Sequence, residues 1–427
     1  MSSYHQDIQF LVSETLNYDP LGDKNVSLID RMLFPAPTGG SYSAPKSVRE
    51  RLYALAEKSL QNTPKLKGKM TINEFAEYLR PEIARIIYNK AIPDKDTVTK
   101  LLQRVRKKAV NDLKTLTHYF PCSLASDSRQ MEFSIGPVTF TSQKKWQEFI
   151  SSEKHDNKDK YFDEARKYYS KFKWIASVDI EECSAQISEE RAKKALEISL
   201  EALSAVFSSQ GSEGLSFQNL IHSPIKTHRL IKEKGKEFNA STQISWKGHH
   251  LSENWFSEIT QHGFNLYLQA VGDIVSEQVK NNVTDLMRRY IDALHWYGEG
   301  IREKDAGVKI IKLTSAIETL VFTKPHDSAK TRTFKERSSS LIAFKNPQEY
   351  RNLKKKFNQM YDARSGVIHG RIKYGTIKWA TAHEYEGLCR SVLFQAIQYY
   401  QSIGFNTAEN LEDEFNFLVE TVSKAAA

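Results

Sequence analysis

Residues 361–370 of this chain read YDARSGVIHG, a segment that combines an arginine, a histidine and a closing glycine. The guanidinium of Arg364 is always charged, and its planar fork suits phosphate oxygens. His369 carries an imidazole, a group that can take up and release protons. These are the two groups needed to cut RNA without a metal, because one moves the proton of a ribose hydroxyl and the other neutralises charge on the phosphate.

The spacing of these two residues is also compatible with a purely structural role. On an ideal α-helix, five residues place two side chains about 140° apart, so Arg364 and His369 are not simple neighbours. The structural alternative is a helix end with Arg364 in a salt bridge, His369 near the carboxyl end and Gly370 as the C′ residue. Spacing alone favours this alternative, and the surrounding sequence has to decide between the two.

Apolar residues on both sides of the segment recur at helical spacing. From about residue 283 the chain is predicted to be helical to its end, and the helix before Arg364 delivers that side chain. Consecutive amphipathic helices with modest connections predict a bundle. The four clearest stripes are Leu286, Tyr290, Leu294 and Tyr297; Ile310, Leu313, Ile317 and Leu320; Tyr350, Leu353, Phe357 and Met360; and Leu388, Val392, Leu393, Ile397 and Tyr400. Residues 324–335 form a hydrophilic connection within this region.

The pattern Tyr-Asp-x-Arg-Ser-x-x-x-His-Gly resembles the Arg-x4–6-His signature of the HEPN superfamily, in the form carried by its Apea-like branch. Two upstream segments, DALHWYGEG at 292–300 and LTSAIETL at 313–320, are similar to the opening helices of that branch. The resemblance covers about residues 285 to 403. It implies a small helical bundle, and many members are metal-independent endoribonucleases in which two copies build one cleft.

The resemblance also implies roles for single residues. His369 is expected to act as general base or acid for the 2′-hydroxyl and the leaving 5′-oxygen, while Arg364 binds the non-bridging oxygens. The products would be a 2′,3′-cyclic phosphate and a 5′-hydroxyl. The scissile phosphate is expected in a cleft at the amino end of the Arg364/His369 element, where two protomers meet.

Further residues are expected to support this site. Asp362 and Ser365 would hold the imidazole or the guanidinium, and Tyr361 belongs to the same motif. Glu318 occupies the place of a helix acid often found near such sites, or it is a surface glutamate or a partner of Arg364. Phosphate contacts are expected from Lys354, Lys355, Lys356, Arg371 and Lys373.

Positive charge is concentrated around the motif. Residues 301–380 hold 18 Lys and Arg against 7 Asp and Glu, whereas the rest of the chain holds 43 against 45. A local basic excess attracts polyanions, although a solvated basic face would look the same in sequence. Its coincidence with the motif favours nucleic acid as the partner.

Composition limits the class of protein. With 427 residues, 40% hydrophobic and 26% charged, the chain is long enough for two or three globular domains. It lacks an apolar run of the roughly 20 residues that span a bilayer, and its first residues lack a signal-peptide pattern. Three separated cysteines and five histidines show neither disulfide nor metal-ligand spacing: Cys122, Cys183, Cys389, His222, His228, His249, His250 and His262. We therefore expect a cytoplasmic protein without membrane contact, metal or other cofactor.

The chain is predicted to be mainly α-helical and to form three regions. Residues 1–120 form a helical amino-terminal region with a loop at 34–45 and a helical segment at 97–118. Residues 121–282 form a small α+β, sensor-like domain, and residues 283–427 form the HEPN-like bundle with an acidic carboxyl-terminal helix. In the middle region we predict strands at 131–140, 173–181 and 238–246 and a helix at 188–207.

Aromatic residues interleaved with lysines also occur in the middle region, and they form either a base-stacking surface or core and rim packing. They are Trp146, Tyr161, Phe162, Tyr168, Tyr169, Phe172 and Trp174.

A cytoplasmic RNase joined to a large amino-terminal sensor-like region resembles antiphage abortive-infection systems, and this resemblance implies an RNA-cleaving toxin. RNA such as tRNA is the expected substrate, a second copy bound through the bundle the expected partner, and a phage-derived signal sensed by the amino-terminal region the expected trigger. The alternative is an inactive or regulatory module that acts in dimerisation, RNA binding or partner recognition.

Overall fold

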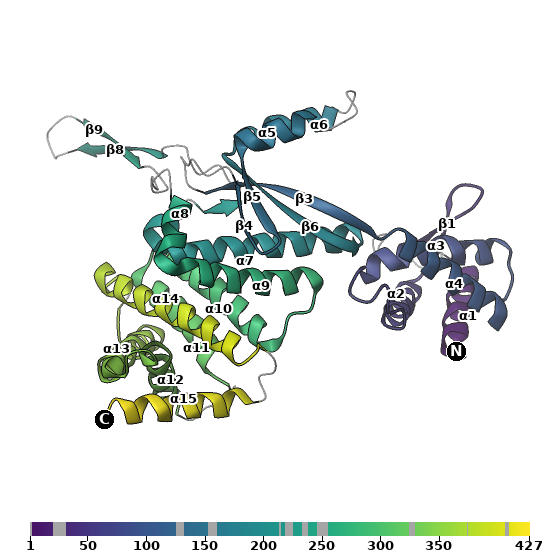
Figure 1. Cartoon of the computed structure of the whole chain (residues 1–427). Coiled ribbons are helices and arrows are strands. Elements are labelled where there is room, and N and C mark those ends of the chain that lie inside the picture. The colour runs from purple at the N-terminus through teal and green to yellow at the C-terminus, as the bar shows by residue number, and fades with distance from the viewer. Residues whose placement is uncertain are drawn as a thin grey trace. The chain divides into compact units, whose positions relative to one another are not determined.

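A computed structural model describes residues 2–19, 31–124, 132–152, 160–212, 215–217, 225–232, 238–245, 255–323, 329–373, 375–405 and 410–427. The chain is mainly helical with a small sheet region, as the apolar periodicity predicts. It divides into two compact units, the first formed by Met1–Leu116 with Ile180–Arg191 and the second by Thr117–Asp179 with Ala192–Ala427. The sheet of the middle region therefore groups with the carboxyl-terminal helices (Figure 1).

The first unit is helical with one small hairpin. Its elements are α1 (Ser2–Asn17), β1 (Met32–Pro35), β2 (Ser41–Ala44), α2 (Lys46–Gln61), α3 (Ile72–Tyr88) and α4 (Lys95–Asn111). The apolar positions of these elements meet in one core that includes Leu11, Phe34, Leu52, Phe75 and Leu101. Helix α3 begins with a capping box, in which Thr71 and Glu74 each bond the other's backbone N–H and satisfy the first turn of the helix.

Two expectations for this unit are wrong. The residues predicted as a loop at 34–45 instead contain much of the antiparallel pair β1 and β2, joined by a turn at Ala36–Gly40. The helix predicted for 97–118 ends at Asn111, and Lys114 begins strand β3 (Lys114–Ser123). At 34–45 the prolines and glycines indicated a loop, although the residues on either side of the turn pair as strands. At 114–118 the apolar run is too short for its period to distinguish strand from helix.

The second unit begins with a five-stranded sheet of order β4-β5-β6-β3-β7. Strands β4 (Glu132–Ile135), β5 (Val138–Ser142) and β6 (Trp174–Cys183) pair antiparallel, and β7 (Ser216–Phe217) pairs with β3. The strands predicted at 131–140 and 173–181 are confirmed, the first as a hairpin that turns at Gly136 with φ +56°. The strand predicted at 238–246 is also confirmed, as β9 (Phe238–Ser245) paired with β8 (Ile225–Lys232).

One face of this sheet is apolar and packs on helices. Phe133 contacts Trp255 at the start of α8 (Trp255–Ile259), with ring centroids 5.3 Å apart. Trp255 in turn contacts Phe207 of α7 (Ala185–Ser212), the helix predicted at 188–207. Gly136 lies directly against Gly272 of α9 (Asn265–Lys280), which follows a short π-helix. The sheet therefore rests on α7, α8 and α9 (Figure 1).

The carboxyl-terminal helices form a bundle around α11. Its elements are α10 (Asp285–Ile301), α11 (Ala306–Val321), α12 (Lys330–Ala343), a 3-10 turn (Pro347–Glu349), α13 (Tyr350–Ile368), α14 (Trp379–Ser402) and α15 (Leu411–Ala425). Helix α11 packs against α10, α13 and α14. All four predicted apolar stripes are buried, which confirms this part of the sequence interpretation. The connection predicted at 324–335 is shorter than expected, because α12 already begins at Lys330.

The acidic last helix is docked on the bundle. Glu412 of α15 pairs with the buried guanidinium of Arg337 at 2.8 Å, and Arg337 also donates to the carbonyl of Val321 at 2.8 Å. The same guanidinium lies over the ring of Phe415. Because Arg337 is buried, this contact fixes the first turn of α15 against α12.

The three cysteines are free, and all three are buried. Within the described ranges every helix is too short or too polar to cross a lipid bilayer. The five histidines considered for a metal have side chains outside the described part of the chain.

Candidate active site

The motif forms the carboxyl end of α13. His369 is the C-cap with φ −91° and ψ 11°, and its N–H donates to the carbonyl of Ser365 at 3.0 Å. Gly370 follows with φ +69°, the left-handed conformation that glycine adopts most easily at a helix end. The helix-end geometry considered from the spacing is therefore present, and both Arg364 and His369 lie within about one turn of that end.

Arg364 is turned toward α11. Its Nη2 lies 3.6 Å from Oε2 of Glu318, and its guanidinium lies over the ring of Tyr361 with 5.7 Å to the centroid. Helical side chains lean toward the amino end of their helix, which brings this one back along α13. Three predicted site residues are thus brought together, and the pairing of Glu318 with Arg364 is the one considered from sequence.

The guanidinium is incompletely satisfied in this arrangement. Its Nε is buried and has no hydrogen-bond partner among the described residues. The 3.6 Å separation from Glu318 is longer than a hydrogen bond. Since buried donors are normally paired, Arg364 retains N–H groups that an incoming anion would satisfy.

Glu318 lies in a partly desolvated place. Burial raises the pKa of its carboxyl, and this effect exceeds the opposing effects of Arg364, of a hydrogen bond from Tyr361 and of Lys330. A carboxyl whose pKa is raised beside a cation is a common feature of functional sites, although structural ion pairs also produce it. The arrangement is compatible with a helix acid near a reaction centre.

Asp362 and Ser365 do not hold Arg364 or His369 in this structure, contrary to expectation. Asp362 accepts a hydrogen bond from Asn358 at 2.8 Å, and Ser365 accepts one from Arg371 at 3.1 Å. The imidazole of His369 is exposed and makes no hydrogen bond or ion pair within the described part of the chain.

Only some of the predicted phosphate contacts are available. Lys354 pairs with Glu336 at 3.0 Å and Lys356 with Glu384 at 3.1 Å. Lys355, Arg371 and Lys373 are exposed. The remaining positive charge therefore lies mainly along the segment that follows α13.

A cavity of about 400 Å³ borders the motif on its carboxyl side. Its walls include Lys304, Gly307 and Val308 at the start of α11 and Val367, Lys373 and Trp379 around the end of α13. Val367 and Gly370, the residues that flank the exposed Ile368–His369 pair, both line it. This cavity lies at the carboxyl end of the element, where the chain folds back after Gly370 and Ile372 N–H donates to the carbonyl of Gly366. The cleft expected at the amino end of the element, where two protomers meet, stays a prediction.

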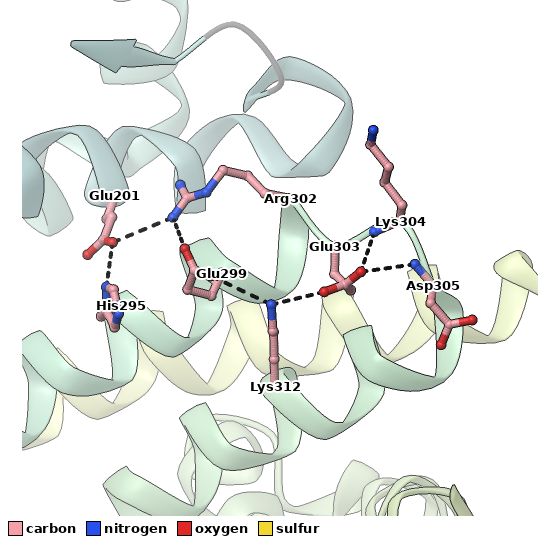
Figure 2. Close-up of polar contacts among 8 residues, drawn as sticks. All are labelled: Glu201, His295, Glu299, Arg302, Glu303, Lys304, Asp305 and Lys312. Atoms are coloured by element: carbon pink, nitrogen blue, oxygen red, sulfur yellow. Dashed lines mark hydrogen bonds and ion pairs between the residues drawn. The ribbon is translucent and has the colours of Figure 1, made fainter. Parts of the chain in front are cut away.

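The structure reveals a polar network that the sequence did not indicate (Figure 2). Glu201 of α7 lies 3.1 Å from His295 of α10 and 3.8 Å from Arg302, the C-cap residue that follows α10. The hydrogen bond to Glu201 raises the pKa of His295 despite partial burial. The network continues through Glu299 and Lys312 to the loop before α11, where Lys312 pairs with Glu303 at 3.0 Å. It ties that loop, and hence one wall of the cavity, to α10.

A second unexpected feature is a buried ion pair behind the cavity. Lys309 of α11 and Glu386 of α14 lie 2.6 Å apart, and their side chains are only 1% and 4% exposed. Trp379 covers the ammonium at 5.7 Å, and His383 lies 3.6 Å from Glu386. In the sequence, the signal for this pair was the position of Lys309 within the apolar run 306–321. Its partner, Glu386, lies 77 residues further along the chain, so the sequence did not reveal the pairing.

The described residues include no cluster of three or more histidine, cysteine, aspartate or glutamate side chains suited to hold a metal ion. Comparison of the chain with protein-family models, with curated proteins and with solved structures finds no match.

Proposed function

We propose that α10–α15 form a metal-independent endoribonuclease that cuts RNA by attack of a ribose 2′-hydroxyl on the adjacent phosphate. The sequence resemblance motivates this proposal. The observation that carries it is the joint position of Arg364 and His369: a guanidinium with an unpartnered Nε among the described residues, and an exposed imidazole, within one turn of the same helix end. The 3.6 Å contact between Arg364 and Glu318 is longer than a hydrogen bond, so it leaves donor capacity on the guanidinium for an anion.

In this mechanism His369 removes the proton of the 2′-hydroxyl or protonates the leaving 5′-oxygen. Arg364 binds the non-bridging oxygens, whose negative charge grows in the transition state. The products are a 2′,3′-cyclic phosphate and a 5′-hydroxyl. The two side chains leave an ideal helix about 140° apart, so a second copy of the bundle would complete the constellation as a homodimer.

We further propose that the enzyme acts as a regulated toxin of antiphage abortive infection in the cytoplasm, with tRNA as one substrate and a phage-derived trigger sensed by the preceding region. Exposed Lys355, Arg371 and Lys373 would contact RNA phosphates, because positive side chains on both sides of the motif attract the backbone. Lys354 and Lys356 would contribute only if RNA displaced their carboxylate partners.

One observation favours a second candidate, a regulatory HEPN-like module that acts in dimerisation or partner recognition. Arg364 is already paired with Glu318 and packed on Tyr361, as a purely structural arginine would be. In such a module the wild type would not cleave RNA, and substitution of Arg364 or His369 would change only stability or association.

The test is incubation of the full chain with total tRNA in EDTA, with analysis of the product ends. We compare the wild type with Arg364→Ala, Arg364→Lys and His369→Ala, and with Arg351→Ala as the matched control on an exposed part of α13. Loss of cleavage in the first three alone, with cyclic phosphate ends in the wild type, supports the enzyme. Cleavage that survives substitution of both motif residues rejects this site. RNA or partner binding without any cleavage favours the module.

A further inference from the structure

The outward face of the sheet in the second unit carries polar side chains in register. Thr139 of β5 lies opposite Ser177 of β6, and Thr141 lies opposite Glu132 of β4. Successive residues of a strand point to opposite faces, so these side chains lie on the face away from α7, α8 and α9. Such alternation is typical of a sheet with one covered face. The unusual feature is that a helix with aromatic side chains lies over this polar face.

Helix α5 (Gln143–Ser152) follows β5 directly and lies on the side of the sheet away from α7, α8 and α9 (Figure 1). It brings Trp146 and Phe149 over the hydroxyl groups, and Phe149 lies 6.1 Å from Tyr119 of β3. Trp146 stacks on Tyr169 of α6 (Lys160–Tyr169), with ring centroids 5.2 Å apart. Between helix and sheet remains a cavity of about 230 Å³, lined by Tyr119, Thr139, Thr141, Trp146, Phe149 and Ser177 among others.

The main indication of a ligand comes from Trp146. It is only 6% exposed, it lines the cavity, and its indole Nε1–H is buried without an acceptor within the described part of the chain. A buried N–H without a partner costs about 1–3 kcal/mol, so native proteins rarely leave one unmet. An acceptor atom on a molecule in the cavity would meet this need.

The charges at the cavity are balanced. Lys145 pairs with Glu132 at 2.9 Å, and Glu132 also accepts a hydrogen bond from Thr141. An anionic or cationic ligand would have to break this pair. A neutral molecule would instead use the threonine and serine hydroxyls as acceptors, because Thr141 already donates to Glu132 and Ser177 to the carbonyl of Thr139.

We propose that this cavity binds a neutral nucleobase or its nucleoside. The aromatic side chains of Tyr119, Trp146 and Phe149 favour a planar π-face. The indole N–H of Trp146 and the hydroxyl oxygens offer a donor and acceptors to the edge of a base. The volume is that of roughly eight water molecules, at about 30 Å³ each, which suits one heterocycle of this size. The site uses none of the residues of the proposed nuclease, so the two proposals stand or fall separately.

The experiment titrates the full chain with adenosine, guanosine, cytidine and uridine, with ribose as the probe that lacks a heterocycle. Saturation-transfer NMR and calorimetry measure binding. We expect at least one nucleoside, and not ribose, to bind with a Kd below about 1 mM. Trp146→Phe keeps the ring and removes the N–H, and it should weaken binding about fivefold. Thr141→Val removes one hydroxyl at nearly constant shape and should also weaken binding.

The matched control is Trp255→Phe. Trp255 is 2% exposed and its indole N–H is likewise without a partner among the described residues, but it lies on the apolar face of the sheet. It should leave the affinity unchanged. Melting temperatures verify that each variant is folded. If Trp146→Phe does not fold, Thr141→Val alone tests the cavity. The inference is overturned if no nucleoside binds at about 1 mM, if ribose binds equally well, or if Trp255→Phe matches the effect of the cavity variants.

Discussion

The buried pair of Lys309 and Glu386 allows a sharp prediction about the stability of the bundle. Both side chains are almost fully buried and their charged atoms are 2.6 Å apart. We consider Lys309→Met, Glu386→Leu and the double variant. Each single change leaves one buried charge without its partner, whereas the double change replaces both charges by apolar groups of similar size.

The expected magnitudes follow from the geometry. At an effective dielectric constant of about 20, two unit charges at this distance attract by roughly 6 kcal/mol. Removing two ions from water costs several kcal/mol for each, so the pair contributes little net stability compared with a hydrophobic pair. We expect each single variant to lose about 3–5 kcal/mol of unfolding free energy and the double variant to lie within about 2 kcal/mol of the wild type.

Urea denaturation of the four proteins, followed by circular dichroism, gives the unfolding free energies and the coupling energy. Glu384→Gln, two residues away on the exposed side of α14, is the matched control and should change stability by less than about 1 kcal/mol. The reasoning is refuted if either single variant loses less than about 1 kcal/mol, or if the double variant is destabilised as much as the sum of the singles.

Three further predictions concern pH and backbone conformation. Glu201 raises the pKa of His295 in the fold, so the stabilisation from this pair is complete below the unfolded pKa of 6.5 and is lost as pH rises through the higher folded pKa. The difference in melting temperature between wild type and His295→Asn should therefore shrink from pH 5.5 to pH 8.5, about one unit below and two units above the ordinary histidine pKa. An unchanged difference would contradict the pairing of His295 with Glu201. Gly136→Ala should lower the free energy of unfolding, measured by urea denaturation, by about 3 kcal/mol, because the new Cβ would overlap the carbonyl of Gly272 and the alanine would have to adopt a positive φ. A loss below about 1 kcal/mol would show that the turn can move away from α9. In Gly370→Ala the new Cβ meets open space, so the free energy of unfolding should fall only by the cost of a positive φ for alanine, about 1–2 kcal/mol. An equal loss at Gly136 and Gly370 would argue against the close approach of Gly136 to α9.

The sequence predicted most of the bundle because its information there is local. Each stripe repeats every three or four residues, and a helix that must bury such a stripe has little choice of orientation. Gly370 likewise marks the end of α13, since the required positive φ suits glycine. The failure at 114–118 occurs where an apolar run is too short for its period to distinguish strand from helix, whereas at 34–45 prolines and glycines indicated a loop and hid the short strands around the turn.

The sequence by itself determined the helices of the bundle, the β4–β5 hairpin and the placing of Arg364 and His369 at one helix end. It could not determine which charges remain available. Of the basic surplus in residues 301–380, Lys309, Arg337 and Lys356 are paired with Glu386, Glu412 and Glu384, all from beyond that segment. The cavity under α5 likewise requires β3, β5 and β6 to meet below one helix. Periodicity acts between neighbours in the chain, whereas ion pairs and cavities depend on distances that only the packed structure sets.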